Sequence, residues 1–313
     1  MTDVRELAQL IEHHAGTDGI HTTAIPRLIL YRASHVEEPM HAVYEPAVCV
    51  VAQGRKQAIA GEGVYVYDAE KYLVVSVGVP AVGRILEASP DKPFLCLALG
   101  LDPAAIAALM LESDIERAGR EQPGSALSVS TLDSKLLDAC VRLVGLLGSP
   151  RDIPVLAPIA EREILYRLLR GDQTARMSQI AFAESRLQDV NRAISWIKRN
   201  FRAAFSVESL ASEARMSPSA LHQYFKTVTG TSPLQFQKHI RLLEARQLML
   251  SQAVDAAAAA HAVGYESPSQ FSREYRRLFG APPVRDIAQL KAQWGNAFPD
   301  FSQVFTERST ATT

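Results

Sequence analysis

Two segments of this 313-residue chain repeat a set of polar side chains at the same spacing, 50 residues apart. SPSALHQYFKTVTGTSP begins at Ser217, and SPSQFSREYRRLFGAPP begins at Ser267 and aligns with it without a gap. The aligned positions and their neighbours carry hydroxyl, amide, imidazole and cationic groups. Side chains of these kinds bind base edges and phosphates, so the repeat points to recognition of DNA.

Both segments have the features of a helix with marked ends. Ser217 and Ser267 are typical N-cap residues, a proline follows each at the first helical position, and Gly230 and Gly280 are typical of a helix C-terminus. Apolar side chains recur at helical spacing and form one stripe on each helix, which we expect to be buried. The stripes consist of Leu221, Phe225 and Val228 in the first helix and Phe271, Tyr275 and Leu278 in the second.

The capping serines and the opposite faces hold the candidate DNA contacts. They are Ser217, Ser219, His222, Gln223 and Lys226 in the first helix and Ser267, Ser269, Gln270, Arg273 and Arg276 in the second. Gln223 suits a bidentate pair with adenine, and Arg273 suits one with guanine. Lys226 and Arg276 lie further along their helices, where we expect phosphate contacts.

A shorter helix precedes each copy, and one long helix joins them. Residues 206–216 and 255–267 have the caps, small residues and tight turn that complete a helix-turn-helix unit, with Gly264 where a positive φ is needed. Residues 233–250 contain no glycine and no interior proline, so they predict a connecting helix of roughly 27 Å. A rod of that size suits recognition helices in consecutive major grooves about 34 Å apart. An apolar stripe over 190–201 and a segment after Pro283 bring the expected number of helices to seven.

The net charge of −1 hides an asymmetry along the chain. Residues 190–290 contain 13 Lys and Arg against 7 Asp and Glu, a net of +6, which leaves −7 for the rest. This distribution fits a nucleic-acid-binding module attached to a part that does not touch phosphates.

The two copies and the segment between them resemble the DNA-binding domain of AraC/XylS-type transcription regulators. The match rests on GYESPSQFSREYRRLFGAPP and on LASEARMSPSALHQYFKTVTGTSPLQFQKHIRLLEAR, and it covers about residues 188–287. The resemblance implies two helix-turn-helix units and control of transcription. Two positions depart from the family pattern: residues 256–260 are a run of alanines, and Gln223 stands where many members carry arginine.

Residues 27–100 contain short β-branched runs separated by turn residues, which predict a small barrel or sandwich. The runs are RLILYRA, AVCVVAQ, GVYVYDA, YLVVSVG, RILEAS and PFLCLALG. YEPAVCVVAQGRK followed by VYVYDAEKYLVVSVGVP resembles the N-terminal, cupin-like domain of one group of AraC-type regulators, over about residues 20–170. The expected fold class is therefore α+β: a cupin-like β-barrel with helices, followed by an all-α double helix-turn-helix domain.

A small-molecule pocket is one reading of the aromatic residues in this part. Tyr65 and Tyr67 share one face of a strand, and Tyr44 and Tyr72 flank neighbouring strands, so the four can line the mouth of a barrel. The alternative is that they cover the edge of the core with their hydroxyls in water. Cys49 and Cys96 lie in apolar strands; packing is the ordinary role of such thiols, and sensing of oxidants or electrophiles is the alternative.

The sequence offers no set of residues for catalysis or metal binding. The five histidines between His13 and His41 do not place two ligands on one face of a strand, and no GxSxG motif, phosphate loop or zinc motif occurs. We therefore expect no enzyme activity, no metal and no cofactor. No apolar run is long enough for a membrane span, and three scattered cysteines suit the cytoplasm.

Three amphipathic helices are expected between the barrel and the repeat, at residues 102–113, 131–149 and 155–171. The second has a wide apolar face, which suits either dimer contacts or packing on the barrel: Leu136, Leu137, Val141, Leu143, Val144 and Leu147. Residues 171–184 form a candidate linker. The expected organisation is a sensor and dimerisation domain over 1–170, this linker, a DNA-binding domain over 185–290 and a tail over 291–313.

Together these patterns predict a sequence-specific, DNA-binding transcription regulator that responds to a small molecule. Its expected partners are double-stranded DNA, a small-molecule effector, a second copy of the chain and, for an activator, RNA polymerase. Two other functions stay open: a cupin-like enzyme with an appended DNA-binding module, and an architectural DNA binder without sequence preference.

Overall fold

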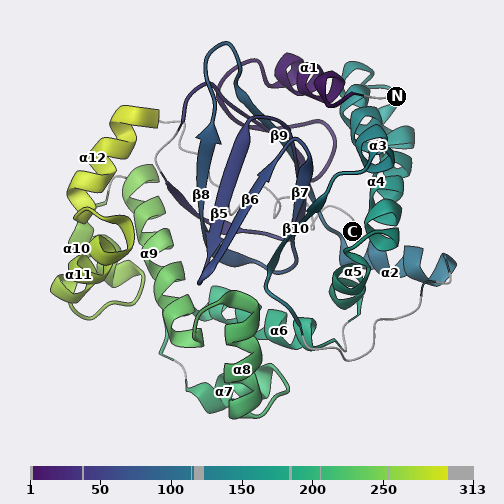
Figure 1. Ribbon diagram of the computed structural model, residues 1–313. Helices are drawn as coiled ribbons and strands as arrows, with labels where there is room; N and C mark the ends of the chain where they lie inside the picture. The colour runs from purple at the N-terminus through teal and green to yellow at the C-terminus, as the bar shows by residue number, and fades with distance from the viewer. Residues whose placement is uncertain are drawn as a thin grey trace.

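Two antiparallel sheets face each other in the N-terminal half of the protein (Figure 1). The computed structural model describes residues 3–36, 39–113, 115, 123–182, 185–204, 206–252 and 254–294. The first sheet has the order β1-β2-β9-β4-β7-β10. Its strands are β1 (Gly19–Thr22), β2 (Leu28–Ala33), β4 (Ala47–Gln53), β7 (Lys71–Val75), β9 (Phe94–Gly100) and β10 (Leu127–Thr131).

The second sheet has the order β3-β8-β5-β6. Its strands are β3 (Met40–Tyr44), β5 (Arg55–Ala60), β6 (Gly63–Asp68) and β8 (Val79–Glu87). The six apolar runs of the sequence correspond to β2, β4, β6, β7, β8 and β9, as expected. The strands β1, β3, β5 and β10 were not expected, because GIHT, MHAVY, RKQAIA and LSVST are short or carry polar residues. These strands form because they pair with neighbouring strands, which their own composition does not indicate.

Helices cover the first sheet and one end of the barrel (Figure 1). They are α1 (Val4–Ala15), α2 (Pro103–Glu112), α3 (Ser134–Gly145), a short 3₁₀ turn η1 (Leu146–Gly148), α4 (Ile153–Arg170) and α5 (Thr174–Ala181). The apolar face of α3 packs into the core, with Leu143 and Val144 at 0% exposure. Helix α5 lies within the segment expected as a linker, and its Met177 and Ile180 are buried.

Seven helices follow in the described part of the C-terminal region, as expected. They are α6 (Arg186–Asn200), α7 (Val207–Glu213), α8 (Pro218–Thr229), α9 (Pro233–Ser251), α10 (Ala256–Ala262), α11 (Pro268–Phe279) and α12 (Pro283–Trp294). The 19 residues of α9 make a rod of about 28 Å. Most of the expected tail lies outside the described residues.

The two helix-turn-helix units belong to different hydrophobic cores. Leu221, Phe225 and Phe236, from α8 and the start of α9, continue the core of the barrel. Phe271 and Tyr275 of α11 belong to a second core that includes the end of α9, α10 and α12. The α+β fold class is confirmed. Within the described residues, no helix has the length and apolar character that crossing a bilayer requires.

Candidate nucleic-acid interface and barrel cavity

The first recognition helix, α8, begins and ends as the sequence predicts. The Ser217 side chain accepts a hydrogen bond from the Ala220 N–H, and Gly230 ends the helix with a φ of +72°. Leu221, Phe225 and Val228 are buried. The candidate contacts on this helix are all exposed: Ser217, Ser219, His222, Gln223 and Lys226.

The second recognition helix, α11, repeats this arrangement. The Ser267 side chain caps it through the Gln270 N–H, and Gly280 ends it with a φ of +80°. Ser267 itself is half-buried, and the other four candidate contacts are exposed: Ser269, Gln270, Arg273 and Arg276. Within the described residues, neither Arg273 nor Arg276 forms an ion pair, whereas Lys238 of α9 pairs with Glu274 at 2.7 Å. The two arginines are therefore available to an external partner.

Glu274 organises the side chains behind the α11 surface. It accepts hydrogen bonds from Lys238 at 2.7 Å, from the Tyr265 hydroxyl at 2.7 Å and from Gln270 Nε2 at 3.2 Å. These donors outweigh the effect of burial and hold the pKa of Glu274 below its ordinary value. Gln270 is thus held by its own helix, so Arg273 is the less restrained long donor on this face.

Helix α9 fixes the two units with respect to each other. The Arg241 guanidinium donates to the carbonyls of Phe201 at 2.6 Å and Gly264 at 3.0 Å, which belong to the loop after α6 and the turn of the second unit. Arg246 forms a bidentate pair with Asp286 of α12 at 2.8 Å for both bonds, and both side chains are 8% exposed. Planar guanidinium groups suit this role because they bind several oxygens in one geometry.

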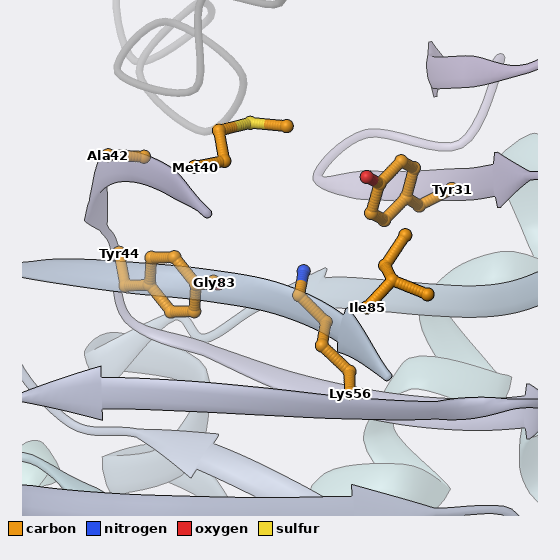
Figure 2. A pocket seen from close by; sticks show the side chains of 7 residues that line it. All are labelled: Tyr31, Met40, Ala42, Tyr44, Lys56, Gly83 and Ile85. Atoms are coloured by element: carbon orange, nitrogen blue, oxygen red, sulfur yellow. The ribbon is translucent and has the colours of Figure 1, made fainter. Parts of the chain in front are cut away.

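A cavity lies between the two sheets of the barrel. Its free interior is about 70 Å³, and its walls are mostly apolar. Its lining consists of Ile20, Ile29, Tyr31, Val43, Tyr44, Glu45, Ala47, Cys49, Lys56, Tyr67, Val75, Cys96 and Ala98. A smaller cavity adjoins it and shares Tyr31, Tyr44 and Lys56 with it (Figure 2).

The four tyrosines singled out from the sequence separate into two groups. Tyr44 and Tyr67 line the cavity, and burial raises the pKa of both hydroxyls. Tyr65 shares the inward face of β6, but its hydroxyl lies 2.6 Å from Ser125 Oγ and outside the cavity lining. Tyr72 is buried under the helices, where burial raises the pKa of its hydroxyl to about 12.

Cys49 and Cys96 both line the cavity, on neighbouring strands β4 and β9. Cys49 pairs with Ala98 and Cys96 with Val51, so the two cysteines are diagonal neighbours and not direct partners. Diagonal positions lie about 7–8 Å apart, too far for a disulfide without movement of the backbone. Burial raises the pKa of the Cys49 thiol to about 11 and that of Cys96 further.

Two of the residues that shape the cavity, Lys56 and Tyr31, are not predicted from the sequence. Lys56 belongs to β5, which the sequence does not predict as a strand. Tyr31 lies in a predicted strand, but no neighbouring residue in the sequence indicates which face of the sheet its side chain occupies. The signal for Lys56 was alternation: Lys56, Ala58 and Ala60 share one face of RKQAIA, and two of the three are small and apolar.

The barrel contacts the C-terminal helices at several points. Lys198 Nζ of α6 lies 2.7 Å from Glu45 of the cavity wall, and the Ala126 N–H donates to the Val228 carbonyl of α8 at 2.8 Å. At the second unit, the His41 ring lies 5.1 Å from the Phe279 ring, edge to face. Both recognition helices therefore touch the barrel with their C-terminal ends and leave their polar faces open.

No three His, Cys, Asp or Glu side chains are placed to hold a metal ion within the described residues. His41 is instead part of the contact between the barrel and α11.

Comparison with known proteins gave matches to both halves of the chain. Residues 24–176 match the family model of the AraC-type transcriptional regulator N-terminus, and residues 210–286 match the model of a helix-turn-helix domain. The HTH-type transcriptional activator RhaS of Salmonella schwarzengrund (strain CVM19633) is 28% identical over 244 residues, which cover 76% of this chain and 80% of RhaS. RhaS of Salmonella agona (strain SL483) matches with the same identity and coverage.

Two solved structures of ToxT from Vibrio cholerae strain SCE256 share the fold. The apo form, of a variant protein, has a TM-score of 0.55 at 11% identity and covers 84% of this chain and 98% of its own. The wild-type protein bound to an unsaturated fatty acid has a TM-score of 0.54 at 12% identity and covers 85% and 96%.

Proposed function

Because the chain belongs to the AraC-type transcriptional regulators, we propose that its two exposed recognition helices read a DNA sequence under the control of a small molecule in the barrel cavity. The observation that carries the proposal is the pair of capped helices on one rod, α9, with most of their polar candidate contacts exposed. Such a pair suits two consecutive major grooves.

On each recognition helix, the residue that we assign to a base lies nearer the N-terminus than the residue that we assign to a phosphate. Arg273 is a free bidentate donor near the N-terminal half of α11 and suits guanine, and Gln223 of α8 suits adenine. Arg276 and Lys226 lie one turn further on and suit phosphates. The basic excess of residues 190–290 supports this division, since it concentrates positive charge in the part of the chain that carries both helices.

The effector part of the proposal rests on the cavity. An apolar space with a few convergent polar groups is typical of a small-molecule site. ToxT, which shares the fold, has been solved with an unsaturated fatty acid. Tyr44 and Tyr67 are the tyrosines we assign to this site, and the cavity then serves binding without turnover. Tyr65 and Tyr72 act as supports of the barrel.

We include a homodimer in the proposal, with a contact surface on α4. The apolar residues of α3 are buried, whereas Val155, Leu156 and Ile159 of α4 are 67%, 43% and 60% exposed. An exposed apolar patch of this kind is typical of a protein interface. Sedimentation of the wild type and of Ile159→Glu tests this part, because a dimer through α4 dissociates in the variant. The chain acts in the cytoplasm, where its DNA is, and contacts RNA polymerase if it activates.

Selection of bound duplexes from a random pool by the full chain tests the DNA function. We expect one enriched site with two half-sites. If about six phosphates are contacted, the logarithm of the association constant should fall with the logarithm of the salt concentration at a slope near −5. Affinity for the selected site equal to that for random duplex would favour an architectural binder. Absence of binding to any duplex, or turnover of a small molecule by the chain, would contradict the proposal.

A further inference from the structure

Lys56 places a positive charge between the sheets of the barrel. Its ammonium nitrogen lies 4.9 Å from the ring centre of Tyr31, 5.6 Å from that of Tyr44 and 5.9 Å from that of Phe94. Figure 2 shows the side chain rising from its strand with the nitrogen between Tyr44 on one side and Ile85 and Tyr31 on the other. Lys56 lines both adjoining cavities.

This charge has no carboxylate partner among the described residues. The other charged residue of the cavity lining, Glu45, is already paired with Lys198 at 2.7 Å. Burial acts against the charge of Lys56, but Tyr44, Cys96 and Cys49 outweigh it and raise the pKa of the ammonium group above its ordinary value. The ammonium group is half-buried, with aromatic rings, two thiols and the Tyr44 hydroxyl around it, and an anion in the cavity would offset the cost of its desolvation.

Covalent capture of a ligand is disfavoured by the same surroundings. An amine attacks a carbonyl only in its neutral form, and Lys56 is held as an ammonium group. A thiol reacts as a thiolate, and burial raises the pKa of Cys49 to about 11, which leaves little thiolate at neutral pH. The ligand that fits is held by charge and by apolar contact.

We propose that the barrel cavity binds a small monocarboxylate, whose carboxylate pairs with the Lys56 ammonium group and whose apolar part lies against Ile29, Val75 and Ala98. One positive charge suits a monoanion, since a phosphate ester would bring a second negative charge into apolar walls. The hydroxyls of Tyr44 and Tyr67 line the same space and can donate to the carboxylate. This inference deepens the proposed function, because it names the chemical class of the effector for the cavity assigned there.

Calorimetric titration of the full chain tests the charge of the ligand directly. The probes are benzoate, phenylacetate and hexanoate, each paired with its primary amide, together with phenyl phosphate. We expect at least one carboxylate to bind about ten- to a hundredfold more tightly than its amide, as expected for a charge-assisted hydrogen bond. Lys56→Met should remove this preference while the protein stays folded, because methionine fills similar space without a charge. Lys92→Met, at an exposed lysine, is the matched control and should leave the preference unchanged.

The outcomes separate this inference from the proposed function. Equal affinity for acid and amide, tighter binding of phenyl phosphate, an unchanged preference in Lys56→Met, or no binding of any probe would overturn the monocarboxylate site. DNA affinity of the same preparations, measured with and without the carboxylate, reports on the proposed function. A carboxylate that binds through Lys56 without changing DNA affinity would support the site and contradict its role as an effector site.

Discussion

Glu45 and Lys198 lie 153 residues apart in the chain and 2.7 Å apart in the structure, where they join the wall of the barrel cavity to the first helix of the DNA-binding region. Their side chains are 18% and 26% exposed. Gly78 packs against the pair so closely that a Cβ atom there would overlap both charged groups. Glu45 also lines the cavity, so this ion pair connects the cavity wall to α6.

Removal of Lys198 should destabilise the protein. Lys198→Met leaves the Glu45 carboxylate partly buried without its partner, at an expected cost of about 1–3 kcal/mol in the free energy of unfolding. Urea denaturation measures the loss. The double variant Glu45→Met with Lys198→Met should recover most of it, and Arg55→Met, which breaks the exposed pair with Glu87, should cost less than about 1 kcal/mol. Strictly additive costs of the two Met substitutions would show that the pair is not coupled.

A second contact between the barrel and α8 depends on two glycines. Gly61 has a φ of +58°, and its backbone lies against that of Gly230, the residue that ends α8. Gly61→Ala should therefore add a steric clash to the backbone strain of a positive φ. The matched variant is Gly16→Ala, at a φ of +67° with no atom within 4 Å of the new Cβ, which should cost only about 1 kcal/mol.

Hydrogen exchange reports on this contact locally. The Ala126 N–H donates to the Val228 carbonyl of α8, so its exchange should accelerate in Gly61→Ala and stay slow in Gly16→Ala. Similar stability and similar exchange in the two variants would show that the barrel does not hold α8 through this approach.

The turns of the two helix-turn-helix units should respond in opposite ways to substitution. Arg215 in the first turn has a φ of +55°, a conformation that costs a residue with a Cβ about 1 kcal/mol, while Gly264 has a φ of +89° at the matching place. Arg215→Gly should raise the thermal stability, and Arg215→Ala, which keeps the Cβ, should not. Gly264→Ala should lower it by more than the backbone strain alone, since the new Cβ would overlap the Arg202 carbonyl. A drop in stability in Arg215→Gly would contradict this account.

Local signals explain why the sequence predicted the recognition helices well. Ser217, Gly230 and the stripe of Leu221 and Phe225 lie within 14 residues, so caps and periodicity define the helix without knowledge of its neighbours. The cavity depends on distant residues instead. Tyr65 and Tyr67 share a face of β6 as expected, but only the position of Ser125, 60 residues away, turns the first of them out of the cavity.

The same limit applies to the charged residues of the cavity. Lys56 lies in a strand that forms because β6 and β8 pair with it. The alternation within RKQAIA indicates the face that Lys56 shares with Ala58 and Ala60, but it does not show the three aromatic rings near the ammonium group. The partner of Glu45 is 153 residues away, so only the packed structure shows it. Contacts of this kind come from tertiary packing, which patterns over a few residues do not encode.

Acid should weaken the contact between the barrel and α11. Burial, together with the nearby charges of Arg246 and His239, lowers the pKa of His41 to about 4, and Asp286 acts in the opposite direction. The unfolded chain binds this proton near pH 6.5, so the stability due to neutral His41 is complete above that pH and is lost as the pH falls towards 4. Between pH 7 and pH 5 we expect a loss of about 2 kcal/mol from this group.

Urea denaturation at both pH values isolates this effect. His41→Leu should show a smaller loss of stability between pH 7 and pH 5 than the wild type, whereas His261→Leu, at an exposed histidine, should behave as the wild type. His239 is half-buried and its partial burial lowers its pKa, so the double variant His41→Leu with His239→Leu should show the smallest loss. An identical pH dependence in the wild type and His41→Leu would show that His41 is not held neutral at this contact.

Base reading should divide between α8 and α11 and be separable by substitution. Arg273→Ala should cost about 1–3 kcal/mol in DNA affinity and relax the preference at one base pair, because it removes a bidentate donor. Arg276→Ala should weaken all sequences similarly and reduce the salt slope by about one, as expected for a phosphate contact. Gln223→Ala should relax a different position about 10 base pairs away, one turn of the duplex. Duplex selection with each variant measures these positions; if they fall within the same few base pairs, or if neither preference changes, the two helices do not occupy consecutive grooves.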